Sequence, residues 1–141
     1  MADTHEIRKK LRTAFVAQAS AAITAGAFSG GAETAIDNTY DGGTENGLGA
    51  DIARLTINVT SAPATAAAAE IWTAIYDDFT GEYEQYKYSH TIAIPVTVTG
   101  SYSAGYLDLT ATLTKAKIKA TGYGFTASLI ATPILPANFA L

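Results

Sequence analysis

Hydrophobic and polar residues alternate in several stretches of the chain. In residues 53–60, Leu55, Ile57 and Val59 alternate with polar residues. A period of two turns one side of the backbone towards a core and the other towards water, so this pattern predicts a half-buried β-strand. Residues 71–76, around the only Trp, are apolar on both faces. This second run predicts a strand in the centre of the protein that is covered on both sides.

More runs with a period of two follow, separated by turns rich in Gly, Ser, Pro and Thr: residues 92–99, 107–113, 115–120 and 123–129. Pro95 cannot donate a hydrogen bond to a neighbouring strand, which places it at a sheet edge or a bulge. In the third run Lys residues alternate with apolar ones, and we expect them to form an exposed face. The pattern predicts an all-β fold, a single antiparallel β-sandwich of the jelly-roll or immunoglobulin-like type.

The beginning of the chain has a different period. Asp3 and Glu6 are spaced like a capping box, and Ile7, Leu11 and Phe15 recur every four residues. This spacing predicts a short amphipathic helix with basic residues on its wet side. A helix of this length is only marginally stable alone. The segment is therefore either a frayed terminus or an arm that a neighbouring subunit orders.

The chain of 141 residues is long enough for one domain. Residues 13–31 are rich in Ala, Ser and Gly, and we expect a strand or arm that leads into this domain. We therefore divide the chain into an N-terminal arm, residues 1–31, part of which could be helical, and a β-sandwich domain, residues 32–141.

Composition excludes several functional classes. There is no Cys, so the chain has no disulfide, no Cys-ligated zinc and no thiol chemistry. No run approaches the roughly 18 to 20 apolar residues of a membrane span, and no signal peptide is recognisable. The net charge is −4, and seven of the nine Lys and Arg residues gather in two short clusters, which are too small for the basic face that nucleic acids require. We expect a soluble protein with neither a nucleic-acid nor a membrane partner.

One loop has the beginning of a calcium-binding pattern. Residues 37–42 place Asp, Thr, Asp and Gly where an EF-hand has its first ligands and its glycine, with Asn38 and Tyr40 between them. The twelfth position, which should be Glu, is Leu48, and no helices are predicted on either side. A plain acidic turn fits better, and the Asp77-Asp78 pair likewise fits a turn at a strand end. We expect no metal and no cofactor.

No catalytic constellation stands out. His5 and His90 are the only imidazoles, and no Ser lies in a nucleophile motif. Glu82 and Glu84 could form the carboxylate pair of a glycosidase, but nothing near them would raise the pKa of one member, so solvated loop charges are the better interpretation. The sequence predicts a protein that is not an enzyme.

An aromatic cluster is the most unusual local feature: Tyr76, Phe79, Tyr83, Tyr86 and Tyr88. Aromatic rings with a polar tip suit protein interfaces and sugar stacking. Ordinary cross-strand packing in a hairpin would explain them equally well. Our candidate interface residues are the arm stripe and three of these tyrosines: Ile7, Leu11, Phe15, Tyr83, Tyr86 and Tyr88.

Three segments resemble the small virion proteins that decorate the capsids of tailed bacteriophages: GAETAIDNTY, LGADIARLTINVTSAPATAAAAEIWTAIYDD and LTKAKIKATGYG. The shared features are the ETAIDN stretch at residues 33–38, an alternating strand that ends in Ser-Ala-Pro at residues 61–63, and a strand that leads to an Asp-containing turn. The Pro-Pro-Gly-like turn of that family is replaced by residues 113–116, and the charged start of the chain is not part of its pattern.

The resemblance implies a non-enzymatic protein on the outer capsid surface of a virion, where it decorates and stabilises the shell. Its partners would be the major capsid protein and copies of itself, and the family offers no catalytic residues to transfer. Two alternatives stay open. One is a carbohydrate-binding virion or secreted module that stacks sugars on the same tyrosines, and the other is a subunit of a tail or neck ring with head-to-tail interfaces.

Overall fold

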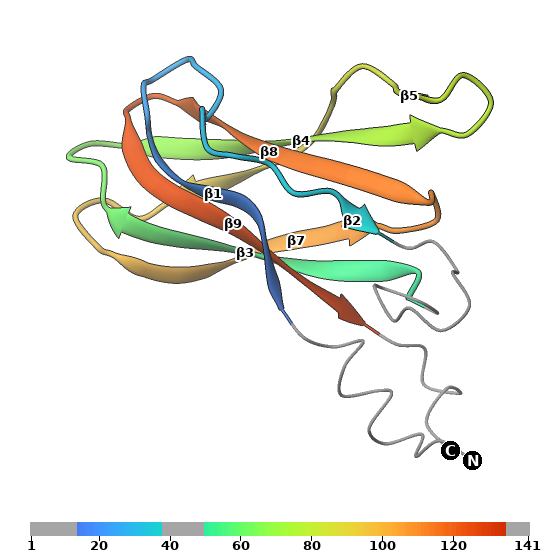
Figure 1. Ribbon diagram of the computed structural model, residues 1–141. Helices are drawn as coiled ribbons and strands as arrows, with labels where there is room; N and C mark the ends of the chain where they lie inside the picture. The colour runs from blue at the N-terminus through green and yellow to red at the C-terminus, as the bar shows by residue number, and fades with distance from the viewer. Residues whose placement is uncertain (1–13, 38–49, 135–141) are drawn as a thin grey trace, which may run out of the picture.

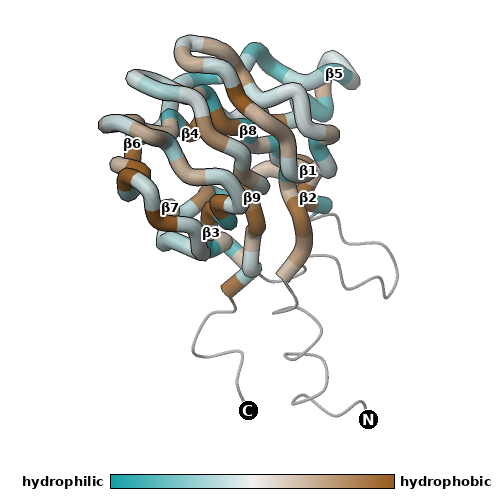
Figure 2. The backbone as a smooth tube through the Cα atoms, turned by 90° about the vertical axis from the view of Figure 1, so that its left-hand side faces the viewer, coloured by the Kyte–Doolittle hydropathy of each residue, from teal (hydrophilic) through white to brown (hydrophobic). Residues whose placement is uncertain are grey.

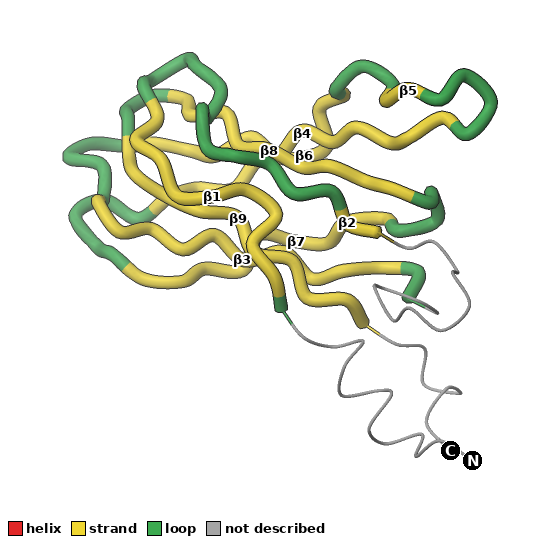
Figure 3. Tube along the Cα trace, viewed as in Figure 1, coloured by secondary structure: helices red, strands yellow, loops and turns green. Residues whose placement is uncertain are grey.

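The computed structural model describes residues 14–37 and 50–134. These residues form nine β-strands joined by turns and loops, and none of them lies in a helix (Figure 3). All the strand pairs are antiparallel, and the strands form two sheets. The prediction of an all-β sandwich is therefore confirmed.

The first sheet has four strands, in the order β1 (Phe15–Ile23), β9 (Phe125–Ile134), β3 (Ile52–Ser61) and β7 (Gly100–Asp108). The second begins with β2 (Ile36–Asp37), β8 (Leu113–Thr121) and β4 (Ala67–Asp77). On the far side of β4 lie two strands that follow each other along the chain, β5 (Glu82–Tyr83) and β6 (Lys87–Ile94). We treat β5 and β6 as one interrupted strand.

The order of pairing decides between the two sandwich types. The first strand pairs with the last, β2 with β8, β3 with β7, and β4 with the interrupted strand β5 and β6. The chain is thus a long antiparallel hairpin that is rolled up so that successive pairs alternate between the two sheets (Figure 1). This is the arrangement of a jelly roll.

The core lies between the sheets and consists mainly of small and branched aliphatic side chains. The inward positions of β3, Leu55, Ile57 and Val59, belong to one buried cluster with Ile71 and Ile118. In Figure 2 brown, hydrophobic segments alternate with paler ones along the strands. Each fully buried Leu, Ile or Val contributes about 1.5 to 3 kcal/mol, so this cluster is the main source of stability.

The connection between β1 and β2, residues 24–35, closes one side of the sandwich. Its Gly26 and Ser29 N–H groups donate to carbonyl oxygens of β8, at 2.7 and 2.8 Å. Further along, Ala32 accepts a hydrogen bond from β1 at 2.8 Å, and Thr34 donates one to it at 2.9 Å. The connection therefore covers one edge of each sheet, which satisfies backbone groups that an open edge would leave exposed.

Gln18 joins the parts that meet on this side. A bulge in β1 turns both Ala17 and Gln18 inward, and both are fully buried. The Gln18 amide nitrogen donates to the carbonyl oxygens of Ser29 and Gly31, at 3.4 and 3.5 Å, and its oxygen accepts the Ile118 N–H at 3.0 Å. One side chain thus bonds to both the connection and β8.

The described part of the expected N-terminal arm belongs to the sandwich. Residues 15–23 form β1, which pairs along its length with β9. The β-sandwich therefore begins before residue 31, because the Ala-rich strand β1 pairs with β9. Residues 1–13 and the acidic loop 38–49 lie outside the described residues.

Two predicted strands differ from the structure. The run 92–99 is strand only as far as Ile94, because Pro95 cannot donate to a ladder and Thr97 has a positive φ of 61°. The run 107–113 spans the end of β7, a turn and the start of β8. In that turn the Asp108 carboxylate accepts the Thr110 N–H at 2.8 Å, which bends the chain away from the sheet.

Replacing Gln18 by Leu is expected to destabilise the fold by about 3 kcal/mol. The change leaves the Ile118 N–H and two carbonyl oxygens buried without partners, at about 1 to 3 kcal/mol for each unsatisfied group. Urea denaturation measures the change. Ser20→Ala, at an exposed position of the same strand, should alter stability by less than about 0.5 kcal/mol. Equal midpoints for Gln18→Leu and the wild type would show that the amide links are dispensable.

Candidate interaction surface

The outer face of the second sheet carries aromatic rings and lysines side by side. We call it the aromatic–lysine face and define it by Phe28, Trp72, Tyr76, Tyr83, Tyr86, Tyr88, Lys115, Lys117 and Lys119. Alternation places the lysines on one side of β8, while Trp72 on β4 lies opposite Lys117. Phe28 comes from the β1–β2 connection and forms a bridge with Lys119.

Trp72 is the centre of this face. The ring of Phe28 meets it edge to face at 5.3 Å, and the ring of Tyr88 does so at 6.0 Å. Its indole N–H donates to the Glu70 carboxylate at 2.9 Å. Edge-to-face pairs contribute about 0.5 to 1.5 kcal/mol each beyond their buried area, so the rings are held in fixed positions.

The lysine ammonium groups lie over aromatic rings. Lys117 is 4.1 Å from the ring centre of Phe28 and 3.9 Å from that of Tyr86. Lys115 is 4.2 Å from the ring centre of Tyr83. The lysines were expected to be exposed, but the structure shows them half-buried, because the rings cover their aliphatic stems. Each cation–π contact of this kind contributes about 0.5 to 1 kcal/mol.

The pKa of Tyr83 is raised above its ordinary value. Burial is the largest cause, and the charges of Tyr76 and Asp37 add to it. The Tyr83 ring also packs edge to face against Tyr76, with ring centres 5.3 Å apart. The neutral phenol, which can donate a hydrogen bond, is therefore favoured up to a higher pH than in an ordinary tyrosine.

The structure brings three of the six candidate interface residues to one face. Tyr83, Tyr86 and Tyr88 all lie on the aromatic–lysine face, where the hydroxyl of Tyr86 donates to the Glu33 carboxylate and that of Tyr88 bonds to Thr91 at 2.7 Å. Phe15 lies on β1 of the other sheet and packs partly buried against the core. Ile7 and Leu11 lie outside the described residues.

Sequence reasoning missed Phe28 and the position of the lysines among the rings. Phe28 lies in a Gly- and Ala-rich connection, far along the chain from the other aromatic residues. Its place depends on backbone bonding to β8, for which the sequence gives no local signal. The alternation of residues 115–119 predicted a lysine row but did not reveal which strand would lie beside it.

The β4–β5 hairpin ends in the expected acidic turn, at the upper right of Figure 1. The side chain of Asp77 accepts the Phe79 N–H at 2.9 Å, and its carbonyl oxygen accepts the Gly81 N–H at 2.8 Å. The Thr112 hydroxyl donates to the Asp78 carboxylate at 3.0 Å. These bonds fix the turn while the side chain of Phe79 remains 96% exposed.

The side chains of Ser89 and His90 are hydrogen-bonded to each other on β6. The Ser89 hydroxyl and His90 Nδ1 are 2.8 Å apart, and His90 Nε2 lies 2.6 Å from the carbonyl oxygen of Ala104 on β7. A Cβ on the neighbouring Gly105 would lie 2.7 Å from that nitrogen, so only glycine fits there. The imidazole thus joins the edges of the two sheets on the side opposite Gln18, and its contacts are those of a structural link.

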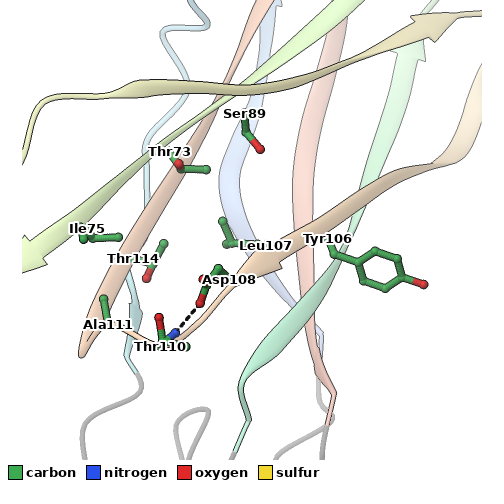
Figure 4. Close-up of a pocket in the computed structure, with 9 residues that line it drawn as sticks. All are labelled: Thr73, Ile75, Ser89, Tyr106, Leu107, Asp108, Thr110, Ala111 and Thr114. Atoms are coloured by element: carbon green, nitrogen blue, oxygen red, sulfur yellow. Dashed lines mark hydrogen bonds between the residues drawn. The ribbon is translucent and has the colours of Figure 1, made fainter.

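A cavity of about 260 Å³ opens between the sheets near the β7–β8 turn (Figure 4). Six of the nine residues that line it have polar side chains: Thr73, Ser89, Tyr106, Asp108, Thr110 and Thr114. The Tyr106 side chain points away from the other five (Figure 4). Thr114 is fully buried, and its hydroxyl has no hydrogen-bond partner. The volume is slightly below the roughly 300 to 1,000 Å³ of common ligand sites.

No group of three or more potential metal ligands occurs among the described residues. The same part of the chain has no helix suited to crossing a membrane. No protein-family model matches the sequence, and neither the curated proteins nor the solved structures include a significant match.

Replacing Thr114 by Val is expected to stabilise the fold by about 1 kcal/mol, because the change removes a buried hydroxyl without a partner and keeps the shape of the side chain. Thermal or urea denaturation measures the effect. Thr114→Ser is the matched control: it keeps the hydroxyl and loses a methyl group, so its stability should fall. A loss of stability in Thr114→Val would show that the hydroxyl is bonded, for example to a buried water.

Stability should fall at alkaline pH partly through Tyr83. Because folding raises the pKa of this phenol, its contribution is complete below the ordinary Tyr pKa of about 10 and is lost as the pH rises above it, where the unfolded chain ionises first. Urea midpoints between pH 8 and 11 should therefore drop more steeply for the wild type than for Tyr83→Phe. Asp37→Asn should give an intermediate slope, and parallel curves for all three would contradict the assignment.

Proposed function

We propose that this chain is a non-enzymatic structural protein of a bacteriophage virion that decorates the capsid and stabilises it. The proposal rests on the aromatic–lysine face, which would be the surface through which each copy of the protein joins the capsid assembly. Its rings are fixed in place by one another and by the lysines. Aromatic anchors that are already ordered lose little entropy on binding, which is typical of protein interfaces.

Two further observations support the proposal. The segments that resemble capsid-decorating proteins include strands β3, β4 and β8, which form the frame of the sandwich. Jelly rolls also occur in viral capsid and lectin domains, which is support by analogy of fold alone. Stabilisation would come from added contacts: many weakly bound copies on a closed shell act together, and a partner that binds only the assembled form shifts the equilibrium towards it.

Carbohydrate binding is the second candidate. Phe28 and Tyr88 are 39% and 49% exposed on either side of Trp72. Such rings can stack on sugars, and lysines beside them suit acidic glycans. Binding of an acidic oligosaccharide to the isolated protein, lost in Tyr88→Ala, would favour this function.

The test of the capsid role is binding to undecorated shells. Tyr88→Ala should weaken retention by about tenfold, which corresponds to the loss of one interface residue worth about 1.4 kcal/mol. Tyr106→Ala removes a 59% exposed tyrosine from the other sheet and is the matched control. Equal retention of both variants would exclude the aromatic–lysine face, and failure of the wild type to bind shells would overturn the function.

The number of copies in purified particles separates a decorating protein from a tail or neck subunit. Decoration requires copies in a number comparable to that of the major capsid protein, whereas a tail or neck ring holds only a few. Quantitative mass spectrometry of particles gives this ratio.

A further inference from the structure

We propose that the aromatic–lysine face receives the acidic β4–β5 hairpin of a second copy, so that two copies pair reciprocally. This inference rests on the proposed function in one respect: it takes the aromatic–lysine face to be a protein contact, and it names the partner. Three features of the molecule support the pairing: an exposed apolar anchor, opposite charges, and the position of both surfaces on one strand.

The hairpin has the properties of an insertion element. Phe79 is 96% exposed at its tip, and the bonds from Asp77 and Asp78 hold the turn in one conformation. Residues 77–84, which include Phe79, contain four acidic residues. A single aromatic anchor in an ordered turn is typical of binding hot spots, and the acids require a partner with positive charge.

The aromatic–lysine face supplies both complements. Its exposed rings, Phe28 and Tyr88, offer an apolar surface to Phe79, and Lys117 and Lys119 lie over the same cluster. The other cations in the described part of the chain are Arg54, on the opposite sheet, and Lys87, which lies 3.9 Å from Glu84. Lys115 to Lys119 is thus the basic cluster within the described residues.

The acids beside the aromatic–lysine face offset part of this charge. Glu70 lies opposite Lys119 in the strand register and accepts the Trp72 indole N–H, and Glu33 accepts the Tyr86 hydroxyl. Both carboxylates keep their negative charge, but three lysines against these two acids leave positive charge in excess. An ammonium group over a ring keeps its full positive charge, so it can still attract an incoming carboxylate strongly.

The tip of the hairpin in the same copy cannot reach the rings around Trp72, although Tyr76 and Tyr83 at its base belong to the aromatic–lysine face. Trp72 and Asp77 belong to one continuous strand, β4, and five residues of extended strand span about 16 Å. The hairpin continues that strand outward, and Asp78 is bonded to the β7–β8 turn through Thr112. The hairpin that occupies the face must therefore come from another molecule.

The position of both surfaces on β4 favours a reciprocal pair. If two copies lie face to face with their β4 strands antiparallel, each hairpin reaches the aromatic–lysine face of the other at the same time. Such a two-fold contact uses the same patch on both molecules and closes on itself. Each pair then contains two identical sets of contacts, which is more than a single head-to-tail contact would provide.

Charge reversal on each side tests the pairing. The hairpin variant Glu82→Lys/Glu84→Lys and the face variant Lys117→Glu/Lys119→Glu should each associate at least tenfold more weakly than the wild type, because like charges then meet. Mixed in equal amounts, the two variants should recover the pair, since opposite charges face each other at both contacts. Analytical ultracentrifugation of the purified full chain measures the association, and circular dichroism checks that each variant is folded.

Phe79→Ala provides a second variant that cannot disturb the core, because the side chain is exposed, and it too should weaken pairing at least tenfold. Asp51→Lys, an exposed reversal ahead of β3, is the control and should leave pairing unchanged. Three results would overturn the inference. The wild type could stay monomeric at millimolar concentration, the charge-reversed variants could pair as well as the wild type, or mixing the two variants could fail to restore pairing. Growth beyond two copies would overturn the reciprocal geometry.

The same proteins distinguish this inference from the proposed function. A wild type that never pairs but still binds undecorated shells would overturn the pairing and leave the capsid role intact. If the charge reversals abolish pairing and mixing restores it, but the wild type does not bind shells, the inference is supported and the capsid role is overturned.

Discussion

The closed side of this sandwich depends on the buried amide of Gln18. This side chain belongs to β1 of one sheet and bonds both to β8 of the other and to the connection between them, where it adds to the backbone bonds of that connection. A buried amide is tolerated only when its donors and acceptor are satisfied, so the side chain fixes the three segments relative to one another. Gly31 must be a glycine for the same arrangement, because a Cβ there would collide with the carbonyl oxygen of Ala19. The position of Phe28 depends on this constraint, because the connection that Gln18 bonds to places the Phe28 ring on the aromatic–lysine face.

Aromatic residues are distributed differently from those of an ordinary globular protein, because few of them are in the core and many lie on the surface. Phe125 is the aromatic member of the buried cluster, which otherwise contains Ala, Ile, Leu and Val. Six of the twelve aromatic residues in the described part of the chain lie on the outside of the second sheet, where rings contact lysines instead of filling space between layers. Small inward residues let the sheets approach closely, so the rings are not needed for packing. Their number on the surface is the physical reason for assigning that face a role in recognition.

Much of the fold could be predicted from the sequence, because β3 and β8 have one buried face and hence a strict period of two. Strand β7 escaped prediction because the bulge at Gly105 separates the buried Ala104 and Leu107 by three positions. Tyr83, Tyr86 and Tyr88 were found because they are close in sequence. Their meeting with Lys115 and Lys117 depends on β4 pairing with β8 on one side and with β5 and β6 on the other. That register is set by contacts between distant parts of the chain, which local patterns do not contain.

The pairing of β1 with β9 has a consequence for how the molecule is made. Strand β1 is synthesised before every other described strand, but β9, which must bond to it, is synthesised after all of them. Until then the inward side of β1 has no sheet to join, and the partners of Gln18 on β8 have not been synthesised either. Domains whose strands pair across such long stretches of sequence fold slowly, and all-β domains take milliseconds to seconds. Synthesis and folding are therefore sequential here, and the exposed half-sandwich is the state in which newly made chains are most at risk of aggregation.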